Sequence, residues 1–254
     1  MWQKTLFLTT FLSLLGLTSP LAYASKTVTI INSPWQPYYG KNLKNWGVSA
    51  EIIKAAFENQ GYNVRFKQAM WARSMKLVKQ GKESCLATAY HTPERAAEYY
   101  FSDGYLESKV AFIKKRSTPN IDWTKLSDFK EKVFVVVKGN SYGKEFDEAT
   151  YIKRYTTVDE TKSLVRHFIR GIGDYVVMDP LVASQLLSGQ QFKSKKVEWD
   201  TVKKPLSTNQ LYIMCSKAID GMTETLKAFN KGLDTITANG TKNNILRLNR
   251  HGPI

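Results

Sequence analysis

The chain has 254 residues and a formal net charge of +15. That length allows one large domain or two lobes of about a hundred residues each, and it suffices to bury a hydrophobic core. The Lys and Arg residues are spread along the whole chain instead of forming a basic block with interleaved aromatics, which disfavours a nucleic-acid partner. A solvated basic surface is the main interpretation of the charge, with an anionic ligand or an anionic membrane surface as weaker alternatives.

The N-terminal segment has the pattern of a secretory signal. Lys4 precedes an apolar run over 6–17, and the small-residue site Ala22-Tyr23-Ala24 follows. This run is too short to cross about 30 Å of hydrocarbon, which argues against a membrane anchor. No Cys follows the site, so a lipoprotein signal is not expected. We therefore predict a signal peptide over 1–24, cleavage after Ala24, and a mature periplasmic protein that begins at Ser25.

The two cysteines, Cys85 and Cys215, are the only possible pair for a disulfide within the chain. An exported chain folds in an oxidising compartment, where an exposed free thiol is a liability, and this favours a bridge. Each cysteine also sits in an apolar, strand-like run, so two separately buried free thiols are the alternative.

Short apolar runs alternate with amphipathic helical patterns from the start of the mature chain, which predicts an α/β protein. The first unit is β-α-β-α-β. Ser49 is expected to cap its first helix and Gly61 to end it. The strands are predicted over 28–31, 64–66 and 85–89, and the second helix over 72–79.

A second α/β unit is predicted in the middle of the chain, beginning with a strand over 110–113. Thr157 and Glu160 match a capping box for a helix that Gly171 ends, and Asp179-Pro180 opens a further helix. The other predicted elements are strands over 133–137, 151–155, 175–178 and 211–215, a helix over 142–149, a long amphipathic helix with apolar residues from Met222 to Ile236, and a short final helix after Asn239-Gly240.

The sequence has none of the common catalytic motifs. It contains no G-x-S-x-G elbow, no Walker loop, no G-x-G-x-x-G after a strand and no H-E-x-x-H. His91, His167 and His251 are scattered without the spacing of metal ligands. We therefore expect a protein that binds without chemistry, with no metal, no cofactor and no enzyme activity.

Several short motifs follow one another along the chain. The stretch from Gly81 to Tyr105 combines a strand, a T-P-E-R turn and an F-S-x-x-Y segment. Around it stand W-x-P-Y at 35–38, V-V-V-K-G-N-S-Y-G at 135–143, D-Y-V-V-M-D at 174–179 and A-N-G-T at 238–241. Together these motifs resemble the polar amino-acid-binding branch of the bacterial periplasmic solute-binding proteins, family 3, which serve ABC transporters. The resemblance covers essentially the whole mature chain.

This resemblance implies a type II periplasmic-binding fold. Two α/β lobes, each a mixed sheet flanked by helices, would be joined by two hinge strands and would close on a ligand between them. The same topology sets the strands of Cys85 and Cys215 side by side, which makes their disulfide reasonable. The hinge strands map to Val110–Ile113 and Leu211–Met214, lobe one to 25–109 plus 212–254, and lobe two to 110–211.

Arg95 is the leading candidate for ligand binding. It falls in the first turn of a helix started by Thr92-Pro93, where exposed N–H groups and the helix dipole disfavour a cation. In the resembling proteins the arginine at this position binds the ligand's α-carboxylate, because a guanidinium group can donate two parallel, charge-assisted hydrogen bonds to a carboxylate. Asp179 aligns with the acidic residue that receives the ligand's ammonium group, although an Asp before Pro is also a good helix N-cap.

Aromatic and polar residues complete the predicted site. Trp35, Tyr38 and Trp71 match positions where rings wall the ligand. Two departures from the family pattern leave an anionic or aromatic ligand as an alternative, because Tyr90 stands where a small hydroxyl residue is usual and Thr88 where a glycine is common. The remaining ligand-binding candidates are Arg73, as a second cation near the cleft, and Asn32, Ser141 and Tyr142.

The sequence as a whole predicts a monomeric periplasmic solute-binding protein. It would capture a small amino-acid-like ligand, an amino acid or a related carboxylate, and deliver it to the membrane permease of an ABC importer. Two alternatives share the fold. One is a dehydratase-like periplasmic enzyme, which needs a carboxylate acting as an acid in the cleft, and the other is a ligand receptor for a membrane sensor.

Overall fold

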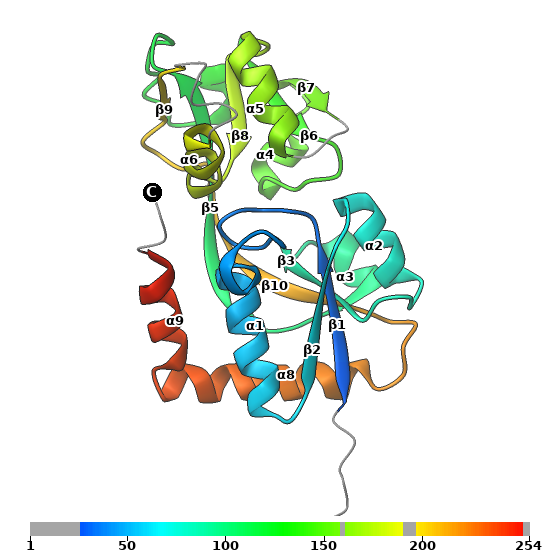
Figure 1. Cartoon of the computed structure of the whole chain (residues 1–254). Coiled ribbons are helices and arrows are strands. Elements are labelled where there is room, and N and C mark those ends of the chain that lie inside the picture. Colours follow the sequence, from blue (N-terminus) through cyan, green and yellow to red (C-terminus); the bar gives the residue numbers. More distant parts are fainter. Residues whose placement is uncertain (1–25, 158–160, 190–196, 251–254) are drawn as a thin grey trace, which may run out of the picture.

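The computed structural model describes residues 26–157, 161–189 and 197–250. The predicted signal peptide and its cleavage site lie outside the described residues. Figure 1 shows two α/β lobes connected by two long strands. We call the lower body in that view lobe one and the upper body lobe two. The α/β class and the two-lobed architecture expected from the sequence are confirmed.

The sheet of lobe one is built around three parallel strands. β1 (Thr27–Asn32) lies between β2 (Asn63–Gln68) and β3 (Cys85–Ala89) and is parallel to both. Parallel neighbours require crossover connections, which α1 (Val48–Asn59) and α2 (Trp71–Lys79) provide. The carboxyl ends of β1 and β3 therefore meet at one edge of the sheet, where Asn32 and Thr88 lie.

Lobe one also contains the C-terminal part of the chain. The long helix α8 (Met222–Ala238) packs on α1, and the missing Cβ of its Gly232 leaves room for the backbone carbonyl of Ala56. The further elements of lobe one are η1 (Lys44–Trp46), α3 (Pro93–Glu98), β4 (Tyr99–Phe101) and α9 (Thr241–Arg250).

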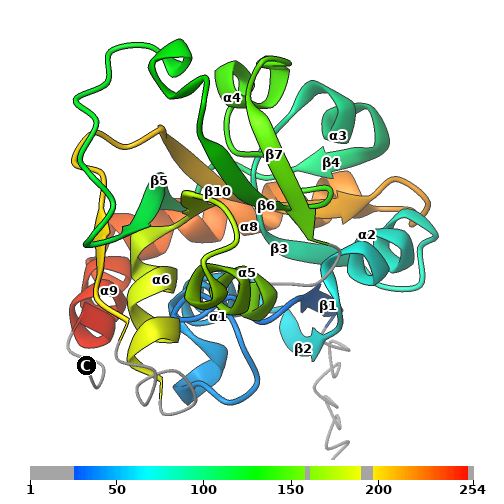
Figure 2. The ribbon, with the colours of Figure 1, turned by 90° about the horizontal axis from the view of Figure 1, so that it is seen from above.

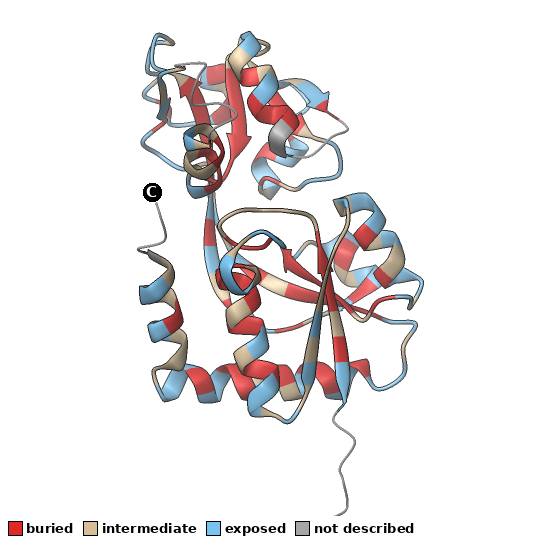
Figure 3. Ribbon diagram, in the orientation of Figure 1, coloured by how far each residue is buried: buried red, intermediate tan, exposed pale blue. Residues whose placement is uncertain are grey.

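Lobe two has a smaller sheet in which β6 (Val133–Val137) is parallel to β7 (Lys153–Thr157) and β8 (Tyr175–Met178). The buried residues shown in red in Figure 3 lie mainly on these strands and on the inner faces of the helices. Phe112, Phe134 and other rings form its aromatic core. The remaining elements are η2 (Leu126–Phe129), α4 (Lys144–Glu148), α5 (Thr161–Arg170), α6 (Pro180–Ser188) and β9 (Trp199–Thr201).

Two long antiparallel strands join the lobes, β5 (Leu106–Lys115) and β10 (Ser207–Ser216). They run side by side in the views of Figures 1 and 2. β5 pairs with β10 from Leu106 to Val110 and with β8 from Ala111 onward. The predicted hinge segments lie within these two strands. The residue boundaries of the lobes, at 110 and 211, stay a prediction.

The elements predicted over 85–89, 133–137 and 175–178 have the bounds found in the structure. One predicted helix cap is wrong. Gly47 stands at the N-cap of α1 in place of Ser49, because the carbonyl oxygens of Pro37 and Tyr38 accept the first free N–H groups of the helix.

The predicted cap at Thr157, which ends β7 opposite Val137, stays a prediction. Its proposed partner Glu160 lies outside the described residues. The short strands β4 and β9 were not predicted, because three-residue segments carry no clear periodicity.

No helix in the described part of the chain is both long and apolar enough to cross a membrane. The disulfide between Cys85 and Cys215 is present, and it links β3 to the neighbouring antiparallel strand β10. Both half-cystines are fully buried in the lobe-one core.

Reduction of this disulfide should lower the stability of the protein. The bridge spans 130 positions of the sequence, and the chain-entropy model gives about 4 to 5 kcal/mol as the upper figure for a loop of that size. Thermal unfolding with and without reductant measures the effect, and the double variant Cys85→Ala/Cys215→Ala should show no response to reductant. Two thiols titrated in denatured, unreduced protein would contradict the bridge.

Candidate ligand-binding site

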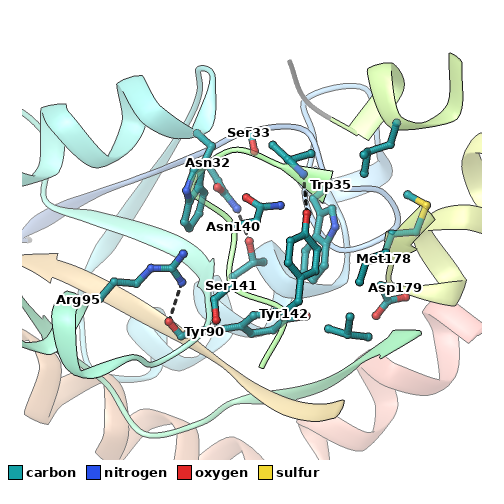
Figure 4. A pocket seen from close by; sticks show the side chains of 16 residues that line it. Asn32, Ser33, Trp35, Tyr90, Arg95, Asn140, Ser141, Tyr142, Met178 and Asp179 are labelled. Atoms are coloured by element: carbon teal, nitrogen blue, oxygen red, sulfur yellow. Dashed lines mark hydrogen bonds between the residues drawn. The ribbon is translucent and has the colours of Figure 1, made fainter. Parts of the chain in front are cut away.

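A pocket lies between the lobes and encloses about 770 Å³ of empty space, its open mouth included. Residues from both lobes line it, as Figure 4 shows for the side chains. The lining residues are Asn32, Ser33, Trp35, Trp71, Thr88, Tyr90, Arg95, Val110, Val137, Asn140, Ser141, Tyr142, Leu164, Val177, Met178 and Asp179.

Arg95 brings a buried positive charge to this pocket. Thr92 caps α3 by accepting a hydrogen bond from the Arg95 backbone N–H at 3.3 Å. The guanidinium donates from Nη1 to the carbonyl of Tyr90 at 2.8 Å and from Nη2 to the carbonyl of Gly139, in lobe two, at 3.3 Å. It also lies over the ring of Trp71, 5.1 Å from the centroid.

Among the described residues, no acidic side chain lies within ion-pair distance of Arg95. Arg95 is 9% exposed, and it takes part in none of the ion pairs formed by the described residues. Burial lowers the pKa of its guanidinium, although an arginine stays charged in proteins. Two of its five N–H donors bond to backbone carbonyls, which leaves donors for an anion in the pocket.

Asp179 is the one carboxylate among the described residues that line the pocket. It is 3% exposed and accepts four hydrogen bonds. Burial raises its pKa above the usual range, against the opposing effect of these bonds. Oδ1 accepts from the backbone N–H groups of Leu181 and Val182 as the cap of α6, and Oδ2 accepts from the hydroxyl of Tyr38 at 2.9 Å and the backbone N–H of Lys109 at 3.2 Å.

Aromatic rings form one side of the pocket. Trp35 stacks on Tyr38 with centroids 4.5 Å apart and meets Tyr90 edge to face at 6.4 Å. The hydroxyl of Tyr90 is hydrogen bonded to Ser108 Oγ of β5 at 2.6 Å. Its phenol is thereby anchored on β5.

Asn32 and Thr88 lie at the ends of β1 and β3. Asn32 Nδ2 donates to Thr88 Oγ1, which fixes the amide, and Thr88 has a φ of 53°. A β-branched residue in the left-handed region is strained, and such strain clusters at functional sites. Asn32 Oδ1 is buried and accepts no hydrogen bond from the described residues.

Ser141 and Tyr142 come from the turn between β6 and α4. Ser141 Oγ donates to Asp147 Oδ2 at 2.6 Å, and the backbone N–H of Tyr142 donates to the same carboxylate. The phenol oxygen of Tyr142 accepts from the backbone N–H of Val137 at 2.7 Å. Burial raises the pKa of Tyr142 to about 12, and the Val137 bond opposes that rise.

Nine of the eleven predicted ligand-binding residues line the pocket. The other two are Tyr38, which lies behind Trp35 and contacts Asp179, and Arg73, which is exposed on α2 away from the lining. Asn140 was missed although it stands next to Ser141 in the quoted motif. Ser33 and the five apolar lining residues were also missed, because Val110, Val137, Leu164, Val177 and Met178 have the sequence pattern of core positions.

The sequence profile of the bacterial extracellular solute-binding proteins, family 3, matches residues 27–248. This chain belongs to that family, as its motifs indicate. No curated protein sequence matches the chain.

Solved structures with the same fold include a histidine kinase sensor domain with similarity to periplasmic binding proteins, at 18% identity and a TM-score of 0.75 over 88% of this chain and 95% of that chain. An ancestral arginine-binding protein bound to glutamine has 24% identity and a TM-score of 0.71, over 87% and 96% of the two chains. The arginine-, lysine-, histidine-binding protein ArtJ from Geobacillus stearothermophilus has 19% identity and a TM-score of 0.68, over 88% and 94%. At these identities the likeness establishes the fold.

The raised pKa of Tyr142 predicts a loss of stability in alkali. The pKa of about 12 in the folded protein exceeds the ordinary value of 10. The contribution of the neutral Tyr142 phenol to the free energy of unfolding is therefore complete below pH 10 and is lost as the pH rises toward 12. This loss amounts to about 2 to 3 kcal/mol. Urea unfolding between pH 9 and 12 should give a shallower decline for Tyr142→Phe than for wild type. The exposed Tyr151→Phe is the control, and equal slopes for Tyr142→Phe and wild type would refute the assignment.

Proposed function

We propose that this chain is a periplasmic receptor that captures a small carboxylate ligand, an amino acid or a related acid, and delivers it to the permease of an ABC importer. The observation that carries the proposal is the buried guanidinium of Arg95, which forms no ion pair with the described residues, in a pocket between two lobes. A buried cation without a counter-charge is costly, and a ligand carboxylate would supply that charge with two parallel hydrogen bonds.

The position of Arg95 supports a coupling between ligand binding and lobe closure. Its side chain starts in lobe one and donates to the carbonyl of Gly139 in lobe two. A ligand whose carboxylate pairs with this guanidinium would also contact the lobe-two turn that contains Asn140 and Ser141, because that turn lines the same pocket. Because the ligand would touch both lobes, it would bind the closed arrangement better than an open one.

Two other functions use the same fold. The likeness to the sensor domain of a histidine kinase favours a receptor that signals to a membrane sensor as the second candidate. A dehydratase-like enzyme has less support, because Asp179, the carboxylate that would act as its acid, already accepts four hydrogen bonds from the protein. Neighbouring genes separate transport from sensing, and a turnover assay on cyclic amino-acid precursors isolates the enzyme.

Truncation of Arg95 should weaken binding of the native ligand. Native mass spectrometry of the purified protein identifies a retained ligand, and calorimetry then measures its affinity. Removing one partner of a buried, hydrogen-bonded charge pair costs about 2 to 5 kcal/mol, so Arg95→Ala should lose roughly thirtyfold or more. The control is Arg65→Ala, which removes an exposed cation from β2 of the same lobe. Binding by Arg95→Ala within about threefold of wild type would disprove the carboxylate assignment.

Export is tested separately. The apolar run and the Ala22-Tyr23-Ala24 site predict that the mature protein starts at Ser25. N-terminal sequencing of periplasmic material should return Ser25 as the first residue. An intact Met1 in that fraction would exclude cleavage of the segment.

A further inference from the structure

The two charged groups of the pocket differ in what they leave for a ligand. Arg95 has unused donors and no acidic partner among the described residues. Asp179 has no such spare capacity for hydrogen bonds, since each of its carboxylate oxygens already accepts two hydrogen bonds. An ionised carboxylate offers about four lone-pair sites, and the protein itself fills them.

Three of the four donors to Asp179 cannot leave without loss of regular structure. The N–H groups of Leu181 and Val182 are the first free donors of α6, and the N–H of Lys109 belongs to β5. An ammonium group in the pocket would therefore have to displace the hydroxyl of Tyr38, the fourth donor.

Tyr38 is held in place from several sides. Its ring stacks on Trp35, its backbone N–H donates to the carbonyl of Trp35 at 2.8 Å, and its own carbonyl accepts from Ser49 N–H of α1 at 3.0 Å. Burial raises the pKa of its phenol, so the hydroxyl remains a donor. The Tyr38 hydroxyl thus occupies the place at Asp179 that an ammonium group would need.

The pocket offers a different partner for a second polar group. Asn32 is 1% exposed, and its Oδ1 is an acceptor without a donor among the described residues, while its Nδ2 is bonded to Thr88. An ammonium group here would be buried without a free counter-charge, which is unfavourable. A neutral donor such as a hydroxyl satisfies Oδ1 without that penalty.

We propose that the ligand is a hydroxy acid whose carboxylate pairs with Arg95 and whose hydroxyl replaces the ammonium group of an amino acid. This inference rests on the proposed function and specifies the class of its ligand. The aromatic rings of Trp35, Trp71 and Tyr90 would cover the rest of the molecule.

The test is calorimetry with matched pairs of L-amino acids and their 2-hydroxy counterparts on protein stripped of bound ligand. Suitable pairs are alanine and lactate, leucine and 2-hydroxy-4-methylpentanoate, phenylalanine and 3-phenyllactate, glutamate and 2-hydroxyglutarate, and arginine and its 2-hydroxy analogue. In the pair that binds most tightly, the hydroxy acid should bind at least tenfold better than the amino acid.

Tyr38→Phe should narrow that preference about tenfold, because it frees Asp179 Oδ2 for an ammonium group. Tyr39→Phe is the matched control, since its hydroxyl bonds to the carbonyls of Ile30 and Lys67 instead, and it should keep the wild-type preference. Thermal unfolding verifies that both variants fold.

An amino acid that binds as tightly as its hydroxy counterpart, or more tightly, overturns the inference but leaves the proposed function intact. Failure of every hydroxy acid to bind also overturns it. If, in addition, no amino acid binds and native mass spectrometry finds no retained molecule, the proposed function fails as well. An equal change of preference in Tyr38→Phe and Tyr39→Phe removes the role given to Tyr38.

Discussion

The carboxylate of Asp179 is the interaction on which the arrangement of the pocket depends. It caps α6, holds the backbone of β5 at Lys109, and accepts from Tyr38 in the other lobe. If this carboxylate were removed, four donors would lose their acceptor, and the buried ones, the Tyr38 hydroxyl and the Val182 N–H, would carry a desolvation penalty. The position of α6, the path of the connecting strand and the orientation of the Tyr38 ring are thus linked through one side chain.

Arg95 contrasts with Asp179 in its electrostatic role. Both side chains are almost fully buried, but four protein donors bond to the acid, whereas the base forms no ion pair with the described residues. Within the described part of the chain, a further anion would therefore find a free partner in the pocket, whereas a further cation would not. This asymmetry distinguishes the site from one that would bind both ends of a zwitterion equally well. It also agrees with the departures at Thr88 and Tyr90 that the sequence motifs reveal.

The fold was predictable from the sequence where burial is complete on both faces of a strand. β3, β6 and β8 are short apolar runs bounded by polar residues, so their first and last residues can be predicted from the sequence. The cap of α1 was not predictable, because backbone carbonyls of a distant turn satisfy the helix instead of the Ser49 side chain. Most of the pocket lining followed from the family motifs. Local pattern could not show that Tyr38 reaches Asp179, 141 residues later, or that Thr88 adopts a positive φ.

The contacts between the lobes limit what a ligand can contribute to closure. Tyr38 with Asp179, and Arg95 with the carbonyl of Gly139, already connect the lobes through protein groups. A ligand shifts the equilibrium between open and closed arrangements only by the difference in its affinity for the two. The Tyr38 bond does not depend on a ligand, whereas the buried charge of Arg95 is unfavourable until an anion arrives. In the proposed function, an anion at Arg95 would therefore be the element that makes closure responsive to ligand, and the Tyr38–Asp179 bond would set the geometry in which that anion is received.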